Sequence, residues 1–310
     1  MKLIMDTSKS NIDILENTLR KVGVLLDILL FDHTTKRNII WATDSYEKLG
    51  KEFAPKKHIA PELVTGEYGL LIQPRASKSL EEQRRRTRDK AEVFTSLKIV
   101  DEINRFVGES QPHKNNWQEY IREIKLEITC GEAPFIVSRY NPTAHTRKLI
   151  TLEHRVGFLD KKLHVVSKFC SDKKEWIFWA KEAFKASYGY EWQGDNVLLA
   201  RENLLYTFID FYRDKFGQRP PTKIQEEFTE IIGWNIFQMD GLRCVVPMSC
   251  RHETKVIPGE TTLFWVTPDT LEKHECEGCK YNRPNKHNGK YVKIMDWNEN
   301  KIIRFVDLIK

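Results

Sequence analysis

Three cysteines in the last third of the chain have a spacing typical of metal ligands. Cys276 and Cys279 form a Cys-x-x-Cys pair with Gly278 inside it, and Cys250 stands upstream of them. Such a knuckle presents two thiolates to one ion, and a second pair of ligands upstream completes the tetrahedron that zinc prefers. We therefore predict a structural zinc site in this stretch of the chain.

The fourth ligand of this site is expected to be a histidine. His252 follows Cys250 closely and is the first choice, while His274 and His287 are alternatives that the spacing leaves open. The competing interpretation is that the cysteines are unpaired surface residues. The presence of Cys250 and three histidines near the Cys-x-x-Cys pair, in a basic and loop-rich stretch, favours a metal site instead. A redox role is disfavoured because a redox Cys-x-x-Cys normally opens a helix of a thioredoxin-like unit.

A second group of residues has the types and positions that suit a nucleotide-like ligand. Glu127 stands in a predicted strand, and a turn follows it from Cys130 through Gly131 and Glu132 to Ala133. A nucleotide needs backbone close to it at the carboxyl end of a strand, where bulky side chains would block it. A tight turn after any strand also uses glycine, and the segment is not a Gly-x-Gly-x-x-Gly fingerprint. The turn alone is weak support for ligand binding.

The next predicted strand ends in Glu191, which Trp192 follows. A carboxylate at a strand tip can accept hydrogen bonds from two ribose hydroxyls, and an indole can lie against an adenine ring. The competing interpretation is an acidic cap for the helix that comes next, but Asp195 fills that role. Glu191 is then left without a structural duty, which favours a ligand-binding one.

An alternation of strands and helices must position these residues. The predicted strands are Lys125–Thr129, Tyr188–Glu191 and Asn235–Met239. The predicted helices are Val100–Val107, Trp176–Ser187, Asn196–Tyr212 and a helix that ends at Ile232. Alternation of this kind favours a parallel α/β sheet, which gathers the carboxyl ends of its strands at one edge.

Two further segments extend the series: Phe94, Thr95 and Ser96 before the first strand, and Asp240 after the third. In this order the segments resemble the cofactor half of the class I methyltransferase fold, in the adenine-specific DNA methyltransferases of restriction–modification systems. The residues that match the family's Tyr-Gly-x-Asp and Ala-Arg-x-Asn-Leu motif are Tyr188, Gly189, Glu191, Ala200, Arg201, Asn203 and Leu204. The departures are Ser96 and Ile128, where the family has proline, and Ala133, where it has glycine.

The resemblance implies S-adenosylmethionine as the ligand. The turn after Glu127 would wrap its methionine part, the loop at Thr95 would fold back over it, and Asp240 would meet the adenine amino group. The cofactor-binding residues that the resemblance implies are Phe94, Thr95, Glu127, Cys130, Gly131, Glu132, Ala133, Glu191, Trp192 and Asp240. The resemblance to this family covers Leu80 to Asp240, at least half of the chain, and extends less clearly into the N-terminal region.

The family's catalytic segment, Asn/Asp-Pro-Pro-Tyr/Phe, is missing from the sequence. In that family it holds the exocyclic amino group and stacks on an adenine flipped out of the duplex. The double proline Pro220-Pro221 lies in a predicted loop and fits neither in residue type nor in order. The chain ends instead in a predicted hairpin of Tyr291–Trp297 and Lys301–Leu308. We expect half of a methyltransferase sheet with an unpaired apolar edge, which a second subunit carrying the catalytic motif covers.

Composition sets the wider limits. The 310 residues are 40% hydrophobic and 30% charged, which suits a folded chain with a buried core. A formal charge of +6 permits DNA as a partner without requiring it. No apolar stretch reaches the length of a membrane span and Met1–Ser8 lacks a signal-peptide pattern, so we expect a cytoplasmic protein. There, Cys130, Cys170 and Cys244 should be core residues and not disulfide partners.

The predicted fold class is α/β, a partial class I methyltransferase (Rossmann-like) sheet with an N-terminal α/β region and a zinc-binding insertion. The expected units are 1–78 for the N-terminal region, 79–247 for the cofactor-binding half domain, 248–290 for the insertion and 291–310 for the hairpin. In the first unit we expect a helix over Ile12–Phe31 and strands over Asn38–Thr43 and Leu70–Gln73. The charged run Ser79–Lys90 is interpreted as a solvated helix face, with phosphate contact as the alternative.

The leading hypothesis is therefore the cofactor-binding part of a DNA adenine-N6 methyltransferase that needs a second subunit for activity. The alternative is a non-catalytic DNA- or protein-binding component that retained the fold. A nuclease finds little support, because the sequence has no convincing Asp…Glu-x-Lys constellation on adjacent predicted strands.

Overall fold

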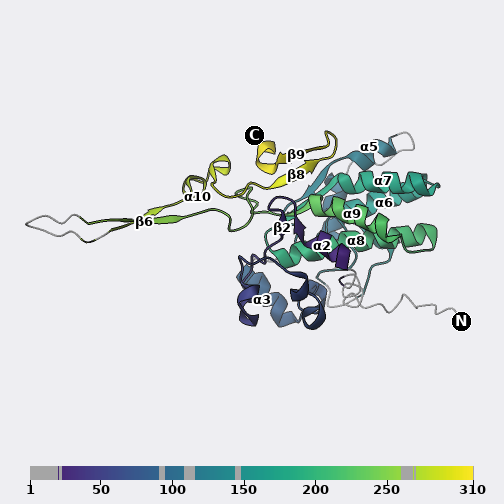
Figure 1. Ribbon diagram of the computed structural model, residues 1–310. Coiled ribbons are helices and arrows are strands. Elements are labelled where there is room, and N and C mark those ends of the chain that lie inside the picture. Colours follow the sequence, from purple (N-terminus) through teal and green to yellow (C-terminus); the bar gives the residue numbers. More distant parts are fainter. Residues whose placement is uncertain are drawn as a thin grey trace, which may run out of the picture.

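The computed structural model describes residues 20, 23–90, 95–107, 116–143, 148–259, 268 and 270–309 (Figure 1). It is a mixed α/β structure with a three-stranded parallel sheet in the order β3-β4-β5. The strands are β3 (Lys125–Glu127), β4 (Ser187–Glu191) and β5 (Ile236–Gln238). The parallel sheet predicted from the alternation of strands and helices is thus confirmed.

Helices join these strands and pack on the sheet. Between β3 and β4 come α6 (Phe158–Phe169) and α7 (Lys173–Lys185), and between β4 and β5 come α8 (Gly194–Phe216) and α9 (Thr222–Asn235). The long helix α8 contacts the sheet, α6, α9 and α2 (Gly23–Leu30), so most of its residues are buried. The fully buried aromatic residues of this main core include Trp176, Phe184, Phe208 and Phe228.

The other face of the sheet is covered by a smaller core. Tyr188 and Tyr190 of β4 and Phe237 of β5 alternate with residues that face the helices, because neighbouring strand residues point to opposite faces. They pack against the antiparallel hairpin β8 (Lys293–Asp296) and β9 (Lys301–Arg304), followed by η9 (Phe305–Leu308). The predicted C-terminal hairpin is confirmed.

The N-terminal region contains less strand than the sequence predicts. It has a two-residue hairpin, β1 (Phe31–Asp32) and β2 (Arg37–Asn38), and then a series of short 3-10 turns. These turns are η2 (Glu47–Leu49), η3 (Lys51–Phe53), η4 (Pro61–Leu63), η5 (Gly66–Tyr68) and η6 (Arg75–Ser77). The strand predicted over Leu70–Gln73 is wrong, and of Asn38–Thr43 only Asn38 lies in a strand, while Ile40 forms an isolated bridge.

The apolar runs in this region mark burial and not strand pairing. Ile39, Trp41 and Ile72 are all buried in the main core. Of the helix predicted over Ile12–Phe31, the described part is α2 with Arg20 before it, and the earlier residues lie outside the described ranges.

Helix α3 (Leu80–Lys90) is the charged helix, and it is not simply a solvated face. Arg84 and Arg85 are exposed, but Arg86 is buried and its guanidinium lies 2.8 Å from a carboxylate oxygen of Asp195. Tyr46 donates a hydrogen bond to the same oxygen at 2.8 Å. Burial raises the pKa of Asp195, but the positive charge of Arg86 outweighs it with help from Lys78, so the pKa is lowered. The pair ties α3 to the first turn of α8.

The remaining helices are short. They are α4 (Leu97–Val107), α5 (Trp117–Arg122) and α10 (Glu277–Tyr281), with the 3-10 turns η7 (Leu152–His154) and η8 (Pro284–Lys286). An antiparallel arm formed by β6 (Glu253–Ile257) and β7 (Thr270–His274) projects away from the body of the molecule (Figure 1). Among the residues that the structure describes, no helix has both the length and the apolarity needed to cross a membrane.

A side chain of β5 binds the backbone of the N-terminal region. The amide group of Gln238 accepts a hydrogen bond from the backbone N–H of Ile40 at 2.9 Å and donates one to the backbone carbonyl of the same residue at 2.8 Å. Both backbone groups of Ile40 are thus satisfied by one side chain. The N-terminal region is joined to the sheet at this point.

Lys162 of α6 is fully buried below the opposite end of the sheet. Its ammonium donates hydrogen bonds to the carbonyl oxygens of Glu123 and Ala186, which precede β3 and β4. Burial, with a smaller contribution from the charge of Lys125, lowers the pKa of Lys162 from 10.5 to about 7. Native Lys162 is therefore largely neutral in a pH range where an unfolded chain still binds the proton.

We expect the stability of the protein to rise between pH 7 and pH 9 through Lys162. The unfolded state binds more protons in this range, so the free energy of unfolding increases with pH, by about 2 kcal/mol in total for one group. Denaturant unfolding at both pH values should show this increase for the wild type and for Lys168→Met, an exposed control in the same helix. Lys162→Met should lack it, and equal pH dependence in all three proteins would contradict the prediction.

Candidate functional site

Four ligand atoms from two separate segments of the chain meet at one point. They are the sulfurs of Cys250, Cys276 and Cys279 and a ring nitrogen of His287, and all lie within 4.8 Å of one another. The Nδ1 atom of His287 is 3.5 Å from the Cys250 sulfur and 3.6 Å from each of the other two. A tetrahedral zinc ion with ordinary bond lengths separates its nitrogen and sulfur ligands by about 3.6 Å. The group could therefore hold a metal ion.

The structure corrects the choice of histidine. His252 is exposed at the base of the arm, just before β6 leads away from the cysteines, and it is not part of the group. His274 is also exposed, at the end of β7. His287 joins the cysteines because the turn η8 returns the chain to them after α10.

Small residues and backbone amides shape this centre. Gly278 has no side chain to obstruct His287, since a Cβ atom there would lie 2.6 Å from the imidazole ring. The backbone N–H of Asn288 points to the Cys276 sulfur at 3.3 Å. Gly289 leaves room for Ser249 and Cys250 in the same way. The glycine that the sequence places inside the Cys-x-x-Cys knuckle is thus required by the packing of the histidine.

The protonation of these groups suits a cation. Burial, followed by the neighbouring thiols of Cys279 and Cys276, raises the pKa of Cys250 to about 12. Three sulfurs at such short separation do not all ionise unless a positive charge compensates them. Burial and the charge of Arg243 lower the pKa of His287, which keeps its ring neutral as a metal ligand must be.

The loop after β3 has the backbone of a close-approach turn. Thr129, Gly131 and Ala133 have left-handed φ angles of 45°, 54° and 62°. This conformation favours glycine. Ala133 stands where the resembling family has glycine, and its backbone has the conformation that a glycine would adopt most easily. Cys130, between these residues, is buried as expected, and so are Cys170 and Cys244.

Glu191 joins this loop to the tip of β4. One of its carboxylate oxygens accepts the backbone N–H of Gly131 at 2.9 Å, and the other accepts the N–H of Gln193 at 3.1 Å. Burial raises the pKa of Glu191. The expectation that Glu191 has no structural duty is therefore wrong. Asp195 is not the helix cap either, because Gln193 occupies the N-cap position and Asp195 pairs with Arg86.

Glu127 has a similar local role at the end of β3. Its carboxylate accepts the backbone N–H of Ile136 at 3.0 Å and so holds the far end of the loop. Burial raises its pKa well above the usual value, and the nearby charge of Glu191 acts in the same direction. The structure therefore brings Glu127, Gly131 and Glu191 together, as the sequence predicts.

Other predicted cofactor residues are held elsewhere by protein contacts. Glu132 accepts hydrogen bonds from the backbone of Arg75 and the hydroxyl of Tyr140, each at 2.7 Å. The indole of Trp192 donates to the backbone carbonyl of Ala42 at 2.8 Å. Both side chains fasten the loop and the strand tip to neighbouring segments.

The two outermost predicted segments add little to this cluster. Asp240 caps the turn that follows β5, where its carboxylate accepts the N–H groups of Leu242 and Arg243 at 3.1 and 3.2 Å. Thr95 is partly buried just before α4, and Phe94 lies outside the described residues. Ligand binding by these residues stays a prediction.

Comparison with known proteins gives no family. No protein-family model matches the chain, and no curated protein or solved structure matches it either.

The motif residues of β4 and α8 are explained by packing. A Cβ atom on Gly189 would lie 3.0 to 3.2 Å from Ile136, Cys130 and Ile236, so glycine lets the loop and β5 approach β4. Asn203 donates to the backbone carbonyl of Glu132 at 3.0 Å. The buried guanidinium of Arg201 donates to the backbone carbonyls of Leu29, Phe31, Gly233 and Ile236. Gly189 and Asn203 therefore position the loop after β3, whereas Arg201 links α8 to the start of β5 and to the N-terminal segment.

Proposed function

We propose that this chain supplies the S-adenosylmethionine site of a DNA adenine-N6 methyltransferase, as the cofactor-binding part of a restriction–modification system. The observation that carries the proposal is the Glu191 carboxylate, which accepts the N–H of Gly131 from the loop after β3. A carboxylate offers about four acceptor positions, and the backbone N–H groups of Gly131, Gln193 and Trp192 all point to it. We infer that a ribose hydroxyl would donate to the same carboxylate.

The surrounding geometry supports this assignment. The loop with left-handed Gly131 and Ala133 follows the carboxyl end of β3, the position that open α/β sheets use for nucleotide-like ligands, and Gly131 in it is partly exposed. The strand order β3-β4-β5 sets that loop beside the tip of β4. Glu127 and Glu191 fix the loop from its two ends, so the site is held in shape before any ligand arrives.

We expect the wild-type chain to bind S-adenosylhomocysteine more tightly than its 2′-deoxyribose analogue, by about tenfold to a hundredfold, because the analogue lacks a hydroxyl that would donate to the charged Glu191 carboxylate. Glu191→Ala should bind both ligands weakly and without this preference. Titration calorimetry measures the four affinities, and Glu153→Ala, an exposed glutamate on another segment, is the control. If Glu191 had only a structural role, Glu191→Ala would bind both ligands more weakly but would keep the preference for the ribose form. If the wild type gave no heat of binding, the cofactor site would be rejected.

The catalytic step is assigned to a second chain. The sequence has no Asn/Asp-Pro-Pro-Tyr/Phe segment to hold a flipped adenine. We therefore propose a partner subunit that carries this segment, with DNA as the substrate of the complex. Methylation of DNA should appear when such a chain, encoded next to this one, is co-expressed with it. Absent methylation despite complex formation would favour a non-catalytic DNA- or protein-binding role.

We also propose zinc as the ion of the cysteine–histidine group, in a structural role. Three thiolates and one imidazole are soft and borderline ligands that suit zinc better than magnesium or calcium. Four protein ligands leave no open position for a substrate, which is the arrangement of structural sites.

A further inference from the structure

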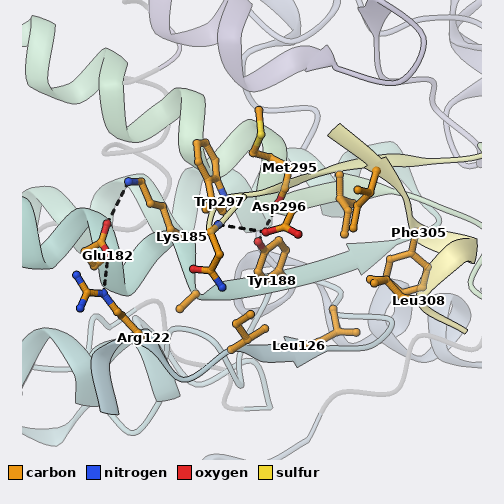
Figure 2. A pocket seen from close by; sticks show the side chains of 15 residues that line it. Arg122, Leu126, Glu182, Lys185, Tyr188, Met295, Asp296, Trp297, Phe305 and Leu308 are labelled. Carbon is orange, nitrogen blue, oxygen red and sulfur yellow. Dashed lines mark hydrogen bonds and ion pairs between the residues drawn. The ribbon is translucent and has the colours of Figure 1, made fainter. Parts of the chain in front are cut away.

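An apolar groove of about 250 Å³ lies between β3 and the C-terminal hairpin (Figure 2). Leu126 of β3 and Tyr188 of β4 line it from the sheet, and Phe305 and Leu308 line it from the segment after β9. Leu126 pairs in register with Tyr188, so the wall of the groove continues the sheet. The hairpin buries Tyr188, whereas Leu126 is 41% exposed. The apolar layer on this face therefore stops before β3.

The strand that borders the groove has an open edge. Within the described residues β3 has a neighbour on one side only, and the N–H of Lys125 donates toward that side, to Ala186. Alternate residues of a parallel strand direct their backbone groups to opposite sides, so the N–H and carbonyl of Leu126 point outward. Ile124, Leu126 and Ile128 recur with the period of a strand and are all exposed. An apolar open edge of this kind is a template for another strand.

The charges at the groove indicate what kind of occupant it takes. Its lining contains two positive side chains, Arg122 and Lys185, and two negative ones, Glu182 and Asp296. Arg122 and Lys185 both pair with Glu182, at 3.0 and 3.1 Å, at one end of the groove (Figure 2). No net charge is left to attract phosphates, so nucleic acid is a poor match. An uncharged extended peptide complements both the apolar walls and the open edge.

We propose that this groove docks a β-strand of a different polypeptide, with apolar residues at alternating positions, which pairs with the outer edge of β3. Backbone hydrogen bonds to Leu126 would supply affinity, and side chains seated between Leu126 and Phe305 would supply specificity, as in other cases of strand addition. That the docked polypeptide is the subunit with the catalytic motif rests on the proposed function. The docking site itself does not.

The test uses a displayed library of random short peptides, selected on the immobilised full chain. We expect selected peptides with alternating apolar residues, whose binding slows hydrogen exchange at the Leu126 amide. Fluorescence anisotropy should show at least about tenfold weaker binding to Leu126→Asp, because the carboxylate must be desolvated in the groove. Leu49→Asp, at a comparably exposed leucine in the N-terminal region, should bind within about twofold of the wild type.

Three results would overturn the proposal. The first is that the selection yields no peptide with alternating apolar residues, and the second is that Leu126→Asp binds the selected peptides as tightly as the wild type does. The third is that the wild type sediments as a dimer and Leu126→Asp as a monomer, which would make a second copy of the chain the occupant. If Leu126→Asp loses its folded circular dichroism spectrum, Ile124→Asp, at a more exposed residue that also lines the groove, replaces it. Both variants should bind S-adenosylhomocysteine like the wild type, so a failure here is separable from a failure of the cofactor site.

Discussion

Replacing Cys276 and Cys279 together by serine should remove the metal from the protein. We expect elemental analysis to fall from about one zinc per chain to below about one tenth, because two neutral hydroxyls replace two thiolates. The effect is large because a structural ion contributes its binding free energy to folding, about 10 to 16 kcal/mol in small zinc domains. A wild-type chain purified without metal, or a double variant that keeps it, would contradict the site.

The two histidines provide a matched control for the fourth ligand. His287→Ala should weaken metal binding by at least about tenfold, whereas His252→Ala should leave it unchanged, because only the His287 ring reaches the three sulfurs. Cobalt substitution reports the coordination directly, since tetrahedral cobalt with thiolate ligands absorbs strongly in the visible range. Equal behaviour of the two variants would assign the fourth ligand elsewhere.

Loss of the metal should loosen one part of the chain more than the rest. The ion would tie Cys250 to the segment after β7, and backbone hydrogen bonds from Val246 to Lys290 and from Val292 to Cys244 continue that junction. We expect limited proteolysis of the double variant to cut first between Cys250 and Tyr291. Among the described residues, none of the four ligands belongs to the main core around α8, so its helices should persist.

Arg86→Ala should destabilise the fold by about 3 to 5 kcal/mol, as expected when one partner of a buried ion pair is removed. The side chains of Arg86 and Asp195 are 1% and 0% exposed, so the variant leaves a carboxylate without its counter-charge in the core. Arg85→Ala, at an exposed neighbour in the same helix, should cost less than about 0.5 kcal/mol. Denaturant unfolding at neutral pH measures both.

The pH dependence of this variant identifies the cause. In the wild type the pKa of Asp195 is lowered, so its stabilising effect is present at neutral pH and is lost as the pH falls through the acid range. Without Arg86 the carboxyl takes up a proton more readily, and the difference between variant and wild type should shrink on acidification. A difference that stays constant with pH would point to lost packing. The double variant with Asp195→Ala should recover part of the loss.

The parts of the fold that could be predicted are those with a local pattern. Strands β3, β4 and β5 follow from short β-type segments, and α8 follows from its regular apolar spacing, so the parallel sheet was predictable. The same pattern failed over Leu70–Gln73, where apolar residues are buried by short turns that form no ladder. The periodicity of apolar residues predicts which side chains are buried. Whether the backbone of these residues forms a strand depends on a partner strand, which the local sequence does not reveal.

The parts that could not be predicted depend on contacts between distant residues. Glu191 and Gly131 are 60 positions apart, Arg86 and Asp195 are 109 apart, and Cys250 and His287 are 37 apart. Spacing alone favoured His252 because it lies closer to Cys250 in sequence. The three cysteines could be predicted because cysteine is rare and the Cys-x-x-Cys knuckle is local, whereas the histidine is selected by the path of the chain through α10 and η8.

Gln238 has a consequence for how the N-terminal region and the tip of β4 move. Its amide bonds both backbone groups of Ile40 and also donates to the backbone carbonyl of Trp192 at 2.8 Å. One side chain of β5 therefore holds two segments that are far apart in the sequence. Segments held in this way open together as one cooperative unit. Release of the N-terminal region should thus expose the backbone beside Glu191 in the same event.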